Sequence, residues 1–116
     1  MQTGRLDKLL EFYKNEPNDE FLQYALATEY LRLNDIEQAL FYYEKLVNEH
    51  PNYVGTYYHL GKLYENLNRK PDAITVYEKG INIARAARDN HALSELQAVY
   101  NVATGLYDDD DDEDDY

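Results

Sequence analysis

The side chains that could do chemistry are few and scattered. Histidine occurs at positions 50, 59 and 91, cysteine is absent, and Ser94 is the single serine. No His-x3-His, His-Glu-x2-His or mixed Cys/His spacing is present, so the sequence predicts no transition-metal site. His59 has no neighbour in sequence that would orient it as a base or a ligand. We interpret it as a partly exposed helix histidine beside Tyr57 and Tyr58.

Cofactor motifs are also absent. The glycines, at positions 4, 55, 61, 80 and 105, are too scattered for a phosphate-binding loop, and no Gly-x-Ser-x-Gly elbow occurs. Neighbouring carboxylates such as Glu16, Asp19 and Glu20 are typical of helix ends. We therefore expect no catalytic residues, no cofactor and no enzyme.

Charge is concentrated in one segment. The chain of 116 residues has a formal net charge of −12, and the run Asp108–Asp115 is entirely acidic. Removing those eight acids leaves 15 acids against 11 bases in the remainder. Binding to nucleic acid or to anionic membranes is disfavoured, since both need clustered Lys and Arg. We expect residues 108–116 to be disordered, because like charges repel and nothing apolar is available to bury.

A 34-residue repeat organises the rest of the chain. Residues 18–51 and 52–85 are identical at eleven positions when aligned without gaps. The first segment reads Gln23-x2-Leu26-Ala27-x2-Tyr30, then Ala39-x3-Tyr43, then Pro51. The second reads Tyr57-x2-Leu60-Gly61-x2-Tyr64, then Ala73-x3-Tyr77, then Arg85.

This pattern resembles the tetratricopeptide repeat, which has the same period and the motif W-x2-L-G-x2-Y…A-x3-F…P. Gln23 departs from it where the family has a large aromatic, and Arg85 departs where it has proline. The resemblance implies two antiparallel helices per repeat. Small residues lie where the helices approach closely, and Tyr43 or Tyr77 fills the space beside them.

All the secondary-structure elements that the sequence predicts are helices. Turn and cap residues predict helices over residues 3–16, 19–32, 36–49 and 53–66, a long helix from Pro71 to about residue 89, and a last one near 91–105. Asp35 to Gln38 has the spacing of a capping box. We expect one all-α domain over residues 1–107, a right-handed stack of helix pairs.

The two ends of this array are incomplete repeats. Leu9 aligns with Tyr43 and Phe12 with Leu46, so helix 3–16 resembles the second helix of a degenerate preceding repeat, whose first helix is missing or lies outside this chain. Helix 91–105 does not follow the 34-residue pattern, and we interpret it as a capping helix.

The family resemblance also implies a function, which is to bind a protein or peptide partner in a concave groove lined by first helices. Carried over by position, that groove comprises Phe21, Tyr24, Thr28, Leu31, Arg32, Tyr58, Lys62, Glu65 and Asn66. The alternative is that a terminal helix covers these residues as ordinary core.

Members of the family that grip chaperone C-termini use a Lys and Asn clamp. Here Tyr24, Thr28 and His59 stand at clamp positions, which disfavours that ligand class and favours a mixed aromatic and apolar ligand. Two other functions stay open. The chain could form a homodimer through its exposed end helices. It could also be an assembly chaperone that holds a basic client through the acidic tail. No cysteine, signal peptide or membrane-spanning run is found, so we expect a cytoplasmic protein.

Overall fold

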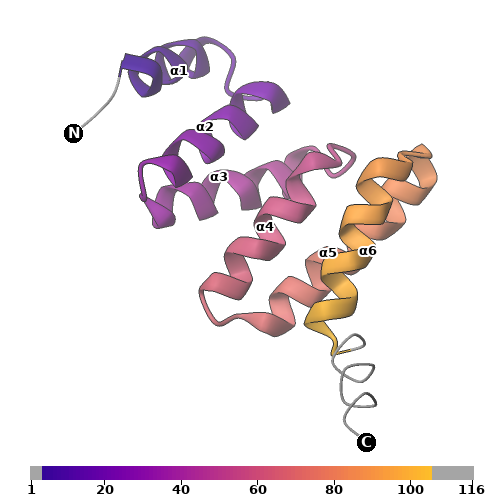
Figure 1. Cartoon of the computed structure of the whole chain (residues 1–116). Coiled ribbons are helices and arrows are strands. Elements are labelled where there is room, and N and C mark those ends of the chain that lie inside the picture. Colours follow the sequence, from indigo (N-terminus) through magenta and orange to yellow (C-terminus); the bar gives the residue numbers. More distant parts are fainter. Residues whose placement is uncertain (1–3, 106–116) are drawn as a thin grey trace, which may run out of the picture. The chain divides into compact units, whose positions relative to one another are not determined.

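Six α-helices make up the part of the chain that the structure describes, residues 4–105 of a computed structural model (Figure 1). No strand occurs within these residues. The expected disorder of residues 108–116 lies outside them. The helices are α1 (Gly4–Asn15), α2 (Glu20–Arg32), α3 (Ile36–Glu49), α4 (Gly55–Asn66), α5 (Lys70–Ala87) and α6 (Asn90–Ala103). The predicted all-α class is confirmed, with helix bounds within a few residues of those expected.

Local sequence explains where the helices begin and end. Asp19 caps α2, its side chain accepting a hydrogen bond from the Leu22 N–H at 3.0 Å. Asn34 and Asn68 have φ values of 64° and 60°, the left-handed conformation expected after a helix. The capping box at Asp35 is only half formed. Its side chain accepts from the Gln38 N–H at 3.3 Å.

The other half of that box is prevented by the backbone. The Asp35 N–H donates instead to the Tyr30 carbonyl at 2.8 Å, so it is not available to the Gln38 side chain. At the end of α5, Arg85 replaces the proline of the family pattern and the helix continues to Ala87. Arg88 then ends it in a left-handed conformation, with φ of 60°.

The chain divides into two compact units, and the division along the sequence falls between Thr56 and Tyr57, inside α4. In unit 1, helix α2 lies between α1 and α3 and packs against both (Figure 1). Leu26, Ala27, Ala39, Tyr43 and Leu46 are entirely buried there. These are the positions that the repeat pattern assigns to the interior, so the amphipathic pattern is confirmed.

A buried carboxylate connects α1 to α2. The Glu29 side chain is only 3% exposed and lies between two arginines. Arg5 of α1 places its Nε 3.1 Å from Glu29 Oε1, and Arg32 Nη2 lies 2.5 Å from Oε2. The sequence pattern gave no sign of this arrangement, because Glu29 lies on the apolar side of its helix.

In unit 2, glycines allow close contact between helices. A β-carbon on Gly61 of α4 would lie 2.1 Å from Cε1 of Tyr77 on α5. One on Gly80 of α5 would lie 2.5 Å from Cβ of Tyr57. The expectation that Gly61 marks a close helix contact filled by Tyr77 is therefore confirmed. Helix α6 packs along α5 (Figure 1).

Gly61→Ala tests this contact. Alanine normally favours a helix over glycine by about 0.5–1 kcal/mol. Here we expect a loss of about 1–3 kcal/mol in the free energy of unfolding, because the Tyr77 ring is fully buried and cannot move aside. Urea denaturation measures it. Gly55→Ala in the same helix is the control, since its nearest contacts would be ordinary ones of 3.8–3.9 Å. Equal stability of the two variants would contradict the interpretation.

Candidate partner-binding surface

The predicted groove residues lie on α2 and α4, and none of the nine is buried. In unit 1, Phe21 is 66% exposed, while the neighbouring Gln23 and Leu26 are completely enclosed. Of the five residues predicted on α2, three are exposed and two, Tyr24 and Leu31, are half-buried. Whether they bind a partner stays a prediction.

Tyr24 and Thr28 belong to an aromatic cluster between α2 and α3. The Tyr24 ring lies 6.4 Å from that of Tyr43 and 5.4 Å from that of Tyr53, measured between centroids. The Thr28 hydroxyl is 3.3 Å from the Tyr43 hydroxyl. The pKa of the Tyr43 hydroxyl is raised above its ordinary value, mainly because the side chain is buried. Tyr24 is thus half-buried and presents only its outer part to a ligand.

Gln23, at the position where the family has a large aromatic, is used for hydrogen bonding. Its amide nitrogen donates to the Pro17 carbonyl at 2.9 Å and to Glu49 Oε1 at 2.8 Å. The pKa of the Glu49 carboxyl is lowered, chiefly by the hydrogen bond from Lys45 and next by the one from Gln23. The side chain thereby joins the start of α2 to the end of α3.

The corresponding surface of unit 2 is more polar. Lys62 and Asn66 are exposed on α4, and Tyr58 and Glu65 are half-buried. The buried Tyr77 hydroxyl donates to Glu65 Oε2 at 2.6 Å. The pKa of Tyr77 is raised far above its ordinary value, chiefly because the phenol is buried and also because it is bonded to the Glu65 carboxylate. Glu65 therefore serves the core as well as the surface.

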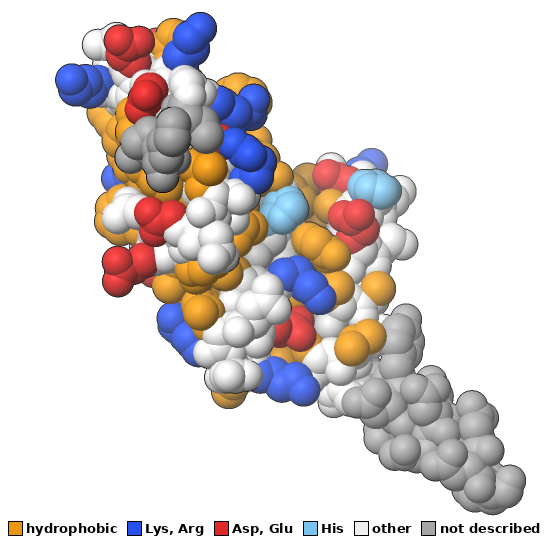
Figure 2. Space-filling view, turned by 60° about the vertical axis from the view of Figure 1, so that its left-hand side comes forward, with side chains coloured by type: hydrophobic (Ala, Val, Ile, Leu, Met, Phe, Trp, Pro, Cys, Tyr) orange, Lys and Arg blue, Asp and Glu red, His pale blue; other side chains and the backbone are white. Residues whose placement is uncertain are grey.

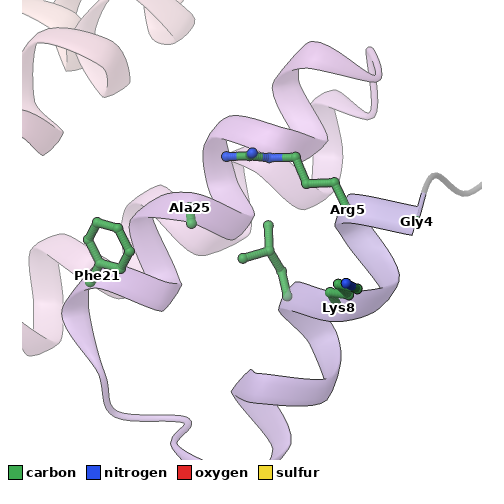
Figure 3. A pocket seen from close by; sticks show the side chains of 6 residues that line it. Gly4, Arg5, Lys8, Phe21 and Ala25 are labelled. Atoms are coloured by element: carbon green, nitrogen blue, oxygen red, sulfur yellow. The ribbon is translucent and has the colours of Figure 1, made fainter.

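A hollow of about 520 Å³ lies between α1 and α2 in unit 1 (Figure 3). Its lining residues are Gly4, Arg5, Lys8, Leu9, Phe21 and Ala25. Of these, only Phe21 was among the predicted groove residues. Figure 2 shows hydrophobic side chains beside basic ones in the upper part of the molecule. The alignment of Leu9 with the core residue Tyr43 was the sequence signal that could have located this hollow.

The described residues contain no group of three or more His, Cys, Asp or Glu side chains that could hold a metal ion. No helix among them is long and apolar enough to cross a membrane. His59 is half-buried on α4, in agreement with the expected partly exposed helix histidine. Burial lowers its pKa below the ordinary 6.5, and Glu95 opposes that shift.

His59→Gln tests the burial of this imidazole. Below about pH 6.5 the unfolded chain binds a proton that folded His59 resists, so the free energy of unfolding falls as the pH is lowered from there. We expect the glutamine variant to lose less stability between pH 7 and pH 5 than the natural chain in urea titrations. His91→Gln is the matched control, since that side chain is 86% exposed. An unchanged pH dependence in His59→Gln would contradict the expectation.

Comparison with known proteins agrees with this geometry. Residues 4–80 match the family model described as anaphase-promoting complex, cyclosome, subunit 3. A tetratricopeptide repeat-containing protein of Methanocaldococcus jannaschii is 42% identical over 55 residues, which make up 46% of this chain. The match spans only 17% of that longer relative.

Solved structures show the same fold. A tetratricopeptide repeat domain protein of Salinibacter ruber is 51% identical, with a TM-score of 0.73, over 76% of this chain and 98% of its own. The TPR2B domain of yeast Sti1, solved as a complex with pHsp70, has a TM-score of 0.78 at 16% identity, over 87% of this chain and 81% of its own. On the repeat, the helix packing and these matches, the chain belongs to the tetratricopeptide repeat family.

Proposed function

We propose that this chain is a non-catalytic protein–protein interaction module. Proteins of its family are generally such modules. The finer part of the proposal is that a peptide or helix of a partner binds the groove residues on α2 and α4. It is supported chiefly by one observation, that all nine stay accessible while the repeat positions between them are buried.

The ligand we propose is apolar and aromatic with a polar flank. Phe21 supplies a large exposed ring, and the outer edges of Tyr24 and Leu31 lie on the same helix. Aromatic anchors of this kind dominate binding energies in many interfaces. Lys62 and Asn66 add polar contacts on α4. The yeast Sti1 domain shows that this fold can hold a partner, but Tyr24, Thr28 and His59 replace the residues that would clamp a terminal carboxylate.

The proposal includes no cofactor, no nucleic acid and no membrane partner, and a cytoplasmic location that fractionation of source cells would test. The competing role of a chaperone for a basic client depends on the acidic segment 108–115, which lies outside the described residues. A form of the chain stopped after Tyr107 separates the two roles.

Binding assays with variant chains test the groove. Partners captured by the intact chain are identified, and their affinity for purified protein is measured by calorimetry. We expect Tyr24→Ala/Tyr58→Ala to weaken binding at least tenfold, and Lys62→Glu to do so without loss of packing, because that side chain is exposed. The form stopped after Tyr107 should bind as the intact chain does.

Phe41→Ala is the matched control, because this aromatic is 55% exposed on α3, away from the predicted groove. Circular dichroism establishes that each variant is folded. A partner lost only on removal of residues 108–116, with strong dependence on salt, would replace the groove by the acidic segment as the binding element.

A further inference from the structure

Helix α1 leaves uncovered the face that the other second helices bury. Aligned on the repeat, Ala39, Tyr43 and Leu46 of α3 are fully buried, and so are Ala73 and Tyr77 of α5. The counterparts on α1 are Arg5, Leu9 and Phe12. Arg5 is exposed, Leu9 is half-buried and Phe12 is 58% exposed. The same face is therefore interior in two helices and surface in the third.

The hollow beside α1 is where a first helix of the preceding repeat would lie. Phe21 is the counterpart of Gly55, and a β-carbon on Gly55 would lie 3.9 Å from Cε1 of Tyr24 on the preceding first helix. Phe21 occupies the same position on α2 and lines the hollow (Figure 3). Among the described residues no helix occupies this place.

Helix α6 resembles a first helix, and among the described residues no second helix follows it. The 34-residue offset fails here, but an offset of 36 places Leu93, Leu96 and Tyr100 on Tyr57, Leu60 and Tyr64. Asp89 caps α6 four residues before Leu93, as Asp19 caps α2 four residues before Gln23.

Packing agrees with this alignment. Leu96 is 1% exposed, and its Cδ1 lies 3.1 Å from the position of a β-carbon on Gly80 of α5. So α6 is the first helix of a third repeat, and no described second helix follows it. Ser94 and Ala98 on its outer side are exposed.

We infer that these two half-repeats complete each other between copies of the chain. Helix α6 of one copy would enter the hollow of the next copy and pair with its α1, making one full tetratricopeptide repeat across the junction. This contact uses the end faces of the array, and Phe21 is the one proposed groove residue that also lines the hollow.

The register within the chain gives the contacts expected at the junction. Thr28 faces Tyr43 inside repeat one, so Ala98 of one copy should face Leu9 of the other. Gly61 packs under Tyr77 inside repeat two, so Gln97 should also face Leu9. Leucine is smaller than tyrosine, and this leaves room for part of the glutamine side chain, which is larger than glycine.

Charge favours the same pairing. Helices joined by short connections run antiparallel, as α2 and α3 do across residues 33–35. The C-terminal end of α6 would therefore lie near Arg5 and Lys8 at the start of α1. The acidic run Asp108–Asp115 begins three residues after Gly105. Attraction between these opposite charges would steer the two copies together and weaken as salt is added.

Such an interface is head-to-tail, so each copy offers one donor end and one acceptor end. Sedimentation velocity of the full chain across a concentration series tests it. We expect species heavier than a dimer to appear as concentration rises, and to diminish with added sodium chloride. Leu9→Glu and, independently, Phe12→Glu should abolish these species by placing a charge on the α1 face. Ala98→Glu should do so on α6.

Mixing gives the sharper result. Leu9→Glu retains a good α6 and Ala98→Glu retains a good α1, so an equimolar mixture should form a 1:1 dimer and nothing larger. Phe41→Glu is the matched control, because Phe41 on α3 is 55% exposed and Phe12 on α1 is 58% exposed. This variant should assemble as the natural chain does. Circular dichroism confirms folding of each variant.

Three results would overturn the inference. They are a natural chain that stays monomeric at every concentration, assembly that survives all three charge variants, and folded monomeric variants that fail to pair on mixing.

Discussion

The close fit of tyrosine rings against residues without bulk is the constraint on which this structure depends. A β-carbon on Gly61 would lie 2.1 Å from Cε1 of Tyr77, and one on Gly80 would lie 2.5 Å from Cβ of Tyr57. Thin layers of paired helices enclose few side chains fully, so a large ring that spans the gap between two backbones supplies much of the buried apolar surface. The small residue at each contact is therefore as necessary as the ring that covers it.

The polar ends of these rings link the core to the proposed binding surface. Tyr43 lies within hydrogen-bonding distance of Thr28, and Tyr77 donates to Glu65. Thr28 and Glu65 were both predicted for the groove. Because a buried hydroxyl needs a partner, part of the surface polarity on α2 and α4 satisfies the interior. A ligand would meet side chains already oriented by these bonds, which lowers the entropy that binding would cost.

The repeat also explains why the two ends differ from the middle. Helix α2 has α1 on one side and α3 on the other, while the terminal helices α1 and α6 pack against α2 and α5 respectively. On α1 the basic Arg5 stands where α3 and α5 have alanine. On α6 the polar Ser94 and Gln97 stand where α4 has Tyr58 and Gly61. Arg5 and Ser94 are exposed to solvent, and Leu9 and Phe12 form the apolar strip on which the inferred junction depends.

The sequence by itself determined the helical class, the two repeats and most helix bounds. Those depend on local features, such as the apolar spacing and the left-handed asparagines at 34 and 68, which act within a turn or two of the chain. It also determined the close contact of Gly61 with Tyr77, because the repeat assigns both residues to one interface.

The tertiary structure alone decided the features that join residues without a shared motif. The burial of Glu29 between Arg5 and Arg32, the use of Gln23 to join Pro17 to Glu49, and the hollow beside Phe21 are of this kind. Their cause is packing between helices, where one long side chain can reach several partners. Periodicity reports which side of a helix is buried, but it does not report which charged group crosses from one helix to the next.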